Sequence, residues 1–165
     1  LSRLEGGEYP LGRAPVNLHA SLSGLLAAFY SDFTDRGFDM AVELEEGLPP
    51  VQGDEGAVLR VFTNLLRNAL DHGQGGMEVR LYREGESVVS LFRNQTDDLT
   101  QEDVPRVFDR FFTSDKMRTG RNTGLGLAIV KALADRMGCP VSAALSDGWF
   151  EIKITWPIQG WNKVN

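Results

Sequence analysis

The sequence predicts an α+β fold, a two-layer α/β sandwich in which helices pack on one face of a mixed, mainly antiparallel sheet. Three stretches repeat apolar residues at helical spacing, and five shorter stretches alternate apolar and polar residues as strands do. The chain has 165 residues, which is enough for one domain with its own core. No internal repeat or low-complexity tract interrupts this order.

The first half of the chain contains two of the predicted helices. Residues 1–16 are rich in glycine and proline, and we interpret them as a linker. Asn17 is placed to cap a first helix that ends near Gly37, and a strand is expected at 38–45. Asp54 is placed to cap the second helix, which carries an apolar face.

The second half contains the remaining strands and the third helix. Residues 77–83 and 87–93 alternate as the two strands of a hairpin. The third helix is expected to end near Gly138, before strands at 141–145 and 149–156. The resulting division is a linker at 1–16, one domain at 17–158 and a C-terminal tail at 159–165.

Composition excludes several classes of protein. The formal charge is −6 and the sequence pI is about 4.9, so there is no electrostatic footprint for nucleic acid. Cys139 is the single cysteine, which excludes an internal disulfide and a cysteine-rich metal site. No apolar run reaches the roughly 18 residues that a membrane span needs, and no secretory leader is expected.

Two asparagines on the second helix are candidate metal and phosphate ligands. Asn64 and Asn68 are four residues apart, so their carboxamides lie on one face of the helix. A carboxamide oxygen can ligate Mg²⁺, a hard ion that also binds phosphate oxygens and water. The alternative is that both are solvated, or that one is buried with its hydrogen bonds met.

A glycine-containing turn opens the third helix. Gly124 and Gly126 flank a leucine, and glycines at a helix start let backbone N–H groups approach an anion closely. The alternative is a helix start that simply packs tightly on a sheet. Before this turn, phenylalanines cluster at 108–112, and the polar segment that follows carries Lys116 and Arg118. We interpret that segment as a lid whose cations reach phosphate, although a solvated loop is an alternative.

Taken in this order, these segments resemble the catalytic ATP-binding domain of bacterial sensor histidine kinases. That domain belongs to the GHKL superfamily shared with gyrase-type ATPases and heat-shock chaperones. The family's N-box resembles Asn64 to Asn68, its F-box resembles 108–112, and its G2 box resembles Gly124 to Leu127. The resemblance implies a GHKL-type fold with a lid loop, ATP as the nucleotide, Mg²⁺ on Asn68, and catalytic roles for Asn64 and Asn68. The nucleotide-binding residues that it implies are Asn64, Asn68, His72, Asn94, Leu99, Phe112, Lys116, Arg118, Thr123, Gly124, Leu125, Gly126 and Leu127.

The family's G1 box is altered in this chain. Asn94 stands where relatives have the aspartate that accepts a hydrogen bond from the adenine amino group, and Thr96 and Asp98 replace two glycines. An asparagine can present either an accepting oxygen or a donating nitrogen to the base. We interpret Asn94 as a working substitute, and its effect on affinity and base selectivity stays open.

The same resemblance implies a function in signalling. The domain would transfer the γ-phosphoryl group of ATP to a histidine on a dimerisation domain, from which a response regulator is phosphorylated. Neither His19 nor His72 lies in the motif that surrounds such an acceptor histidine. We therefore expect a monomeric catalytic module on the cytoplasmic side of a longer, membrane-anchored and homodimeric sensor, whose partner is the histidine-containing dimerisation domain of its own full-length kinase.

Two other functions compete with this interpretation. Serine kinases that act as anti-sigma factors have a glutamate at the position of Asn64, where it serves as a general base. Because an amide cannot accept a proton in this way, serine phosphorylation is disfavoured here. A nucleotide-binding pseudokinase module is the second alternative, and only the altered G1 box supports it.

Overall fold

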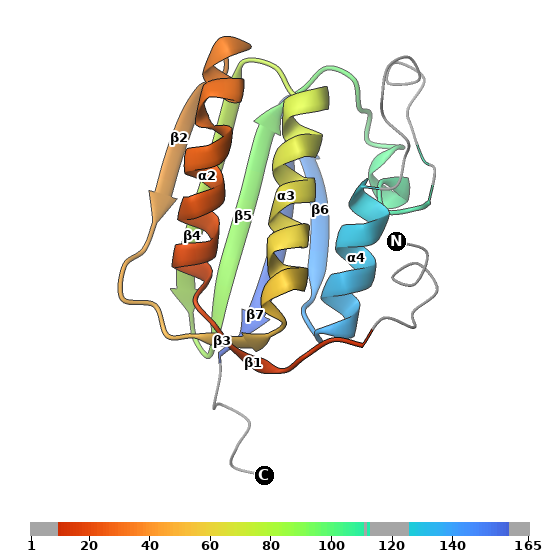
Figure 1. Ribbon diagram of the computed structural model, residues 1–165. Coiled ribbons are helices and arrows are strands. Elements are labelled where there is room, and N and C mark those ends of the chain that lie inside the picture. The colour runs from red at the N-terminus through yellow and green to blue at the C-terminus, as the bar shows by residue number, and fades with distance from the viewer. Residues whose placement is uncertain (1–9, 111, 113–125, 159–165) are drawn as a thin grey trace.

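The structure of the chain is a computed structural model that describes residues 10–110, 112 and 126–158. Its main sheet has the order β2-β4-β5-β7-β6, in which β2 and β4 are parallel and the other pairs are antiparallel (Figure 1). The predicted mixed, mainly antiparallel sheet is therefore confirmed. The five strands are β2 (Asp39–Leu44), β4 (Gly76–Glu84), β5 (Ser87–Gln95), β6 (Val141–Ser146) and β7 (Trp149–Pro157).

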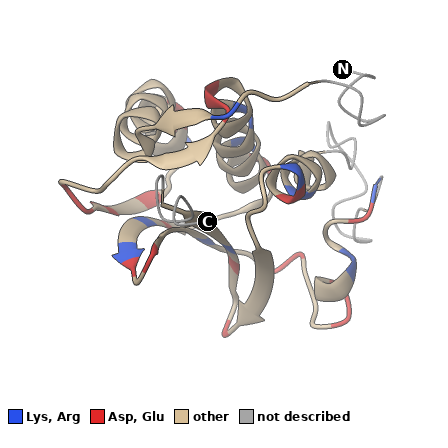
Figure 2. Ribbon diagram, turned by 90° about the horizontal axis from the view of Figure 1, so that it is seen from below, with Lys and Arg blue, Asp and Glu red and all other residues tan. Residues whose placement is uncertain are grey.

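Three α-helices, α2 (Leu18–Asp35), α3 (Glu55–His72) and α4 (Gly126–Arg136), lie side by side over the same face of this sheet (Figures 1 and 2). The predicted caps are present. The Asn17 Oδ1 accepts from the Ala20 N–H at 3.0 Å, and the Asp54 Oδ1 accepts from the Ala57 N–H at 2.8 Å. These side chains satisfy backbone donors that would otherwise lack partners at the helix starts.

The core lies between the helices and the sheet. On β7 every second side chain from Phe150 to Trp156 is buried, because a strand turns alternate side chains to the same face. The rings of Phe62 on α3 and Trp156 pack with their centroids 5.6 Å apart. The indole N–H of Trp156 donates to the hydroxyl of Ser90 at 2.9 Å, which satisfies two fully buried polar groups.

A second, two-stranded sheet was not predicted. β1 (Ala14–Val16) pairs antiparallel with β3 (Val51–Gly53), so residues that we assigned to the linker pair with the folded domain. Strands of three residues have too little alternation to be recognised, and their pairing is distant in sequence. Asp54 strengthens this junction, because its Oδ2 accepts from the Gly12 N–H at 2.7 Å while its Oδ1 caps α3.

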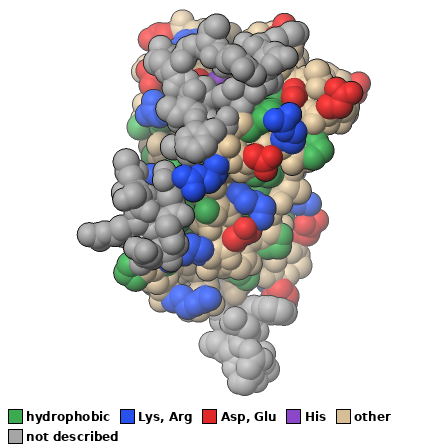
Figure 3. Space-filling model, turned by 90° about the vertical axis from the view of Figure 1, so that its right-hand side faces the viewer, with side chains coloured by type: hydrophobic (Ala, Val, Ile, Leu, Met, Phe, Trp, Pro, Cys, Tyr) green, Lys and Arg blue, Asp and Glu red, His purple; other side chains and the backbone are tan. Residues whose placement is uncertain are grey.

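Charged side chains occupy much of the remaining surface. On the sheet face opposite the helices, Arg93 forms ion pairs with Glu78 and Glu151. On the side of the molecule that carries α4, basic and acidic side chains are intermixed (Figure 3). Among the described helices, none is both long and apolar enough to cross a membrane.

Candidate functional site

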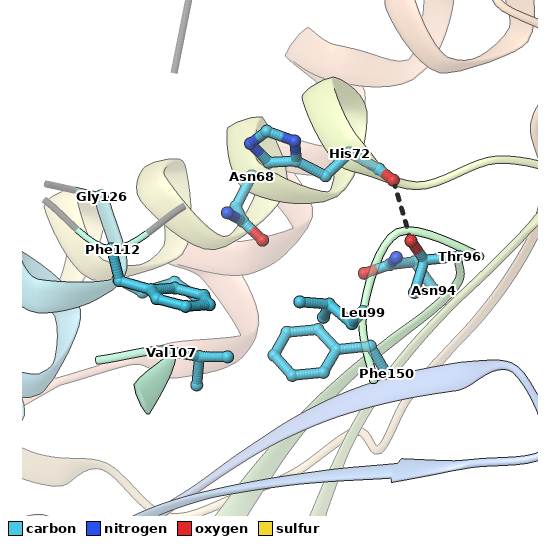
Figure 4. A pocket seen from close by; sticks show the side chains of 10 residues that line it. Asn68, His72, Asn94, Thr96, Leu99, Val107, Phe112, Gly126 and Phe150 are labelled. Atoms are coloured by element: carbon cyan, nitrogen blue, oxygen red, sulfur yellow. Dashed lines mark hydrogen bonds between the residues drawn. The ribbon is translucent and has the colours of Figure 1, made fainter. Parts of the chain in front are cut away.

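One cavity lies where the end of α3, the end of β5 and the start of α4 meet (Figure 4). Polar groups from α3 and β5 face apolar side chains from β7 and from the segment between β5 and α4. Seven of the predicted site residues are brought together here, namely Asn68, His72, Asn94, Leu99, Phe112, Gly126 and Leu127. The cavity is also lined by Thr96, Val107 and Phe150.

The α3 side of the cavity is formed by two side chains one helical turn apart. Asn68 and His72 share a face because Leu65, Leu66, Ala69 and Leu70 are buried on the other side of the helix. In Figure 4 the carbonyl oxygen of Asn68 points into the cavity. Asn64 is half-buried one turn earlier on α3, and it is not among the residues that line this cavity as the described chain defines it.

Asn94 forms the floor of the polar side, and its orientation is fixed. Its side chain is 6% exposed, and its Nδ2 donates to the carbonyl oxygen of Gln95 at 3.2 Å. Because a carbonyl oxygen can only accept, the amide nitrogen must face Gln95. The Asn94 oxygen is therefore the atom turned toward the cavity (Figure 4). In this geometry the group that Asn94 presents to the cavity is a hydrogen-bond acceptor.

The opposite side of the cavity is apolar. Leu99, Val107, Phe112 and Phe150 supply its side chains, and Val107 and Phe150 belong to the core. The guanidinium of Arg106 lies 5.0 Å from the centroid of the Phe112 ring. An apolar slot with one fixed acceptor at its floor suits a flat heteroaromatic ring that carries an amino group at its edge.

Three lining residues were not predicted as site residues. Thr96 appeared in the sequence only as the replacement of a glycine, and its hydroxyl in fact donates to the His72 carbonyl oxygen at 3.3 Å (Figure 4). Val107 and Phe150 give no sequence signal, because each has the pattern of an ordinary core residue. Five predicted residues lie outside the described part of the chain, namely Lys116, Arg118, Thr123, Gly124 and Leu125.

The residues present fit a magnesium ion that is coordinated mainly by phosphate oxygens and water. In the described ranges, no three His, Cys, Asp or Glu side chains come together as a metal site. On the α3 side of the cavity, the described side chain that offers an amide oxygen is Asn68. Mg²⁺ keeps several waters and takes oxygens from phosphates, so one amide oxygen beside a phosphate site is sufficient.

The fold and the cavity define a class, an α+β sandwich with a half-polar, half-apolar cavity at one end of its helix layer. The sequence profile of the family described as "Histidine kinase-, DNA gyrase B-, and HSP90-like ATPase" matches residues 53–160. This chain belongs to that family, as its resemblance to the GHKL superfamily predicted.

Curated relatives are sensor histidine kinases. The "Sensor histidine kinase component HK1" of Mycobacterium tuberculosis strain H37Rv is 34% identical over 137 residues, which cover 82% of this chain and 81% of that protein. The "Probable sensor histidine kinase TcrY" of the same strain is 33% identical over 172 residues, or 99% of this chain and 35% of TcrY. "Sensor histidine kinase YcbM" of Bacillus subtilis is 26% identical, and the match covers 47% of its length. The chain thus spans half or less of the length of these longer kinases.

Solved structures share the fold. The catalytic domain of histidine kinase ThkA superposes with a TM-score of 0.78 at 19% identity, covering 90% of this chain and 99% of that domain. Histidine kinase AdeS of Acinetobacter baumannii gives 0.77 at 18% identity, covering 96% of this chain and 74% of AdeS. Full-length ShkA, solved in complex with AMPPNP, gives 0.80 at 24% identity, covering 95% of this chain and 33% of ShkA. The predicted fold class is confirmed by these likenesses.

Proposed function

We propose that this chain is the catalytic domain of a sensor histidine kinase, which binds Mg-ATP and transfers the γ-phosphoryl group to a histidine on a separate dimerisation domain. The observation that carries the proposal is the convergence of Asn68, Asn94 and the start of α4 on one cavity with apolar walls. The relatives, which are sensor histidine kinases, support it.

The adenine ring is expected in the apolar slot. The oxygen of Asn94 accepts a hydrogen bond from the exocyclic amino group, and this contact distinguishes adenine from guanine, which carries an oxygen at that position. Leu99, Phe112 and Phe150 contact the faces and edge of the ring. His72 borders the nucleotide from the end of α3.

The phosphates are expected between Asn68 and the start of α4. The amide oxygen of Asn68 would hold Mg²⁺, and when bound the ion supplies positive charge to the phosphate oxygens. The first N–H groups of an α-helix have no acceptor within the helix, so those at the start of α4, at Gly126 and Leu127, would face an anion bound there. Further phosphate contacts are proposed for Lys116, Arg118, Thr123, Gly124 and Leu125.

The reaction is an in-line phosphoryl transfer. A nitrogen of the acceptor histidine forms a bond to the γ-phosphorus, and the bond from that phosphorus to the β–γ bridging oxygen breaks, so ADP leaves with the electron pair. Positioning and charge neutralisation are the main contributions of the domain. The amide of Asn64 cannot take a proton from a serine hydroxyl, which favours an intrinsically nucleophilic imidazole over the anti-sigma alternative.

The acceptor and its partners lie outside this chain. We propose that the acceptor histidine belongs to the dimerisation domain of the same full-length kinase, a homodimer, and that the phosphoryl group passes on to a response regulator. The full-length protein is proposed to be anchored in the membrane with this domain in the cytoplasm. The length of TcrY and YcbM relative to this chain supports a longer parent protein.

Substitution of Asn68 tests the metal and nucleotide assignment. Asn68→Ala should lose most of the Mg²⁺-dependent part of ATP affinity, because it removes the amide oxygen that faces the cavity. Gln52→Ala is a matched control, since Gln52 is a half-buried side-chain amide on β3, which precedes the other end of α3. Calorimetric titration with ATP, with and without Mg²⁺, measures the effect. Equal ATP affinity of the unmutated chain in both conditions would remove Mg²⁺ from the proposal.

Phosphotransfer tests the activity itself. The chain alone should not become labelled by γ-labelled ATP, whereas the dimerisation domain of its parent protein, added separately, should acquire acid-labile phosphate. Acid-stable phosphate on serine would favour the anti-sigma alternative. Tight ATP binding without transfer to that domain would favour the pseudokinase.

A further inference from the structure

Thr96 lines the nucleotide cavity, yet its hydroxyl makes hydrogen bonds to the protein. The side chain is 8% exposed, and its Oγ1 donates to the His72 carbonyl oxygen at 3.3 Å. The same oxygen accepts from the Asp98 N–H at 3.1 Å. Its one proton is therefore committed to α3, so this hydroxyl is not a donor to the nucleotide.

The contact with His72 satisfies the end of α3. The last carbonyl oxygens of a helix have no partner within the helix. In α3, the Ala69 oxygen accepts from the Gly73 N–H at 2.7 Å, and the Leu70 oxygen accepts from the Arg36 guanidinium at 3.1 Å. The His72 oxygen accepts from Thr96. Thr96 thus secures the last turn of the helix that carries the α3 side of the cavity.

Thr96 also joins this helix end to the segment that holds Asn94. The Thr96 N–H donates to the Gly148 oxygen at 2.9 Å, in the turn between β6 and β7. The preceding residue, Gln95, accepts at its carbonyl oxygen from the Gln74 N–H at 2.9 Å and from the Asn94 side chain. The carbonyl that orients the Asn94 amide is therefore held next to the residue that binds α3.

We propose that Thr96 is a positioning residue for base recognition. Its hydroxyl fixes the separation between the end of α3 and the segment 94–98, so that the Asn94 oxygen meets the amino group of a base bordered by His72. The inference rests on the proposed function, since it assumes that the cavity takes an adenine nucleotide. The proposal predicts that Thr96 contributes to affinity for the base and not to affinity for the phosphates.

Three variants of the full 165-residue chain test this role. Thr96→Val keeps the shape of the side chain and removes the hydroxyl, whereas Thr96→Ser keeps the hydroxyl. Ser90→Ala is the matched control, because it removes another buried hydroxyl, which lies on β5, is bonded to Trp156 and is not among the residues that line the cavity. Each protein is titrated with Mg-ATP, adenosine and Mg-GTP, and its melting temperature is recorded.

The loss of one positioning hydrogen bond should weaken ATP and adenosine to the same degree in Thr96→Val, by about fivefold, and lower the preference for ATP over GTP. Thr96→Ser should restore both. Ser90→Ala should melt at a lower temperature and keep the affinities of the unmutated chain. Rescue by serine and equal effects on ATP and adenosine would not follow from a general loss of stability.

The experiments distinguish a failure of the proposed function from a failure of the positioning role of Thr96. An unmutated chain that binds neither ATP nor adenosine overturns the proposed function. If the unmutated chain binds, three results overturn the proposed positioning role of Thr96. They are normal binding of all three ligands by the valine variant, loss of ATP but not adenosine by that variant, and a serine variant that binds no better than the valine variant. Should the valine variant not fold, Thr96→Ala is judged by the same criteria. The Asp98 amide of the unmutated chain must also be protected from hydrogen exchange, because it donates to the Thr96 hydroxyl.

Discussion

Replacing Asn94 by aspartate restores the residue that the family's G1 box has at this position, and the structure predicts that this change will destabilise the folded chain. The amide nitrogen of Asn94 donates to the Gln95 carbonyl oxygen at 3.2 Å, and the side chain is 6% exposed. An ionised carboxylate would place an oxygen against that carbonyl oxygen. One hydrogen bond is lost and a repulsive contact takes its place.

The expected cost follows from burial and hydrogen bonding. Loss of the neutral hydrogen bond costs about 1 kcal/mol, and the buried carboxylate oxygen that then faces Gln95 without a donor costs about 1–3 kcal/mol more. For a chain of this size, each kcal/mol lowers the melting temperature by about 2–4 °C, so a decrease of about 5–15 °C is expected. A charge-assisted bond to the adenine amino group would return about 1 kcal/mol in the complex. This gain is made in the complex alone, so the ATP affinity of Asn94→Asp should rise by no more than about fivefold, while its melting temperature falls.

Melting curves and calorimetric titrations with ATP and GTP measure both quantities, with Asn94→Ala as the variant that removes the acceptor without adding charge. Asn94→Ala should weaken ATP and lower the preference over GTP. The melting-temperature difference between Asn94→Asp and the unmutated chain should narrow as pH falls from 8 to 5, because a protonated carboxyl can donate to Gln95. An aspartate variant with unchanged melting temperature and tenfold tighter ATP binding would refute the reasoning.

Two other predictions concern the phosphate side and the buried thiol. Apart from its chain neighbours and its own helix backbone, a Cβ at Gly126 meets no described atom within 4 Å, so Gly126→Val should fold. Because its side chain would occupy space at the proposed phosphate site, it should weaken ATP more than adenosine, and parallel losses in titrations would contradict the phosphate assignment. Burial raises the pKa of Cys139 from 9.0 to about 12, against an opposing effect of Arg13. The folded thiol binds its proton more tightly than the unfolded one, so stability should fall as pH rises from about 9 toward 12. The melting temperature of the unmutated chain should then decline more steeply between pH 8 and 10 than that of Cys139→Ala. Equal slopes would contradict the raised pKa of the thiol.

Much of the main fold could be predicted because its signals are local. The caps at Asn17 and Asp54, the apolar faces of the helices and the alternation of β7 depend on neighbours in sequence. The parallel pairing of β2 with β4, and the small sheet of β1 and β3, depend on contacts between distant segments. Such contacts leave no periodic trace in one sequence.

For the candidate site, the sequence could predict which residues line the cavity better than how their side chains are oriented. The resemblance to the family's N-box and G1 box pointed to Asn68 and Asn94, and the structure brings both to the same cavity. The sequence could not show which atom of the Asn94 amide faces the cavity, since that depends on the position of the Gln95 carbonyl oxygen. Nor could it show that Thr96, a replaced glycine, holds the end of α3. Both facts follow from backbone geometry and not from residue type.

The arrangement also explains why α3 dominates the site although it supplies only two side chains to the lining. Its first turn is fixed by Asp54, which caps the helix with one oxygen and holds the Gly12 N–H with the other. Its last turn is fixed by two donors from different segments of the chain, Arg36 and Thr96, which satisfy carbonyl oxygens at the end of α3. A helix of 18 residues is about 27 Å long, so these anchors hold both ends of one rigid element. The distance between Asn68 and Asn94 is therefore set by hydrogen bonds within the protein, and we expect the polar side of the cavity to be formed before a nucleotide binds.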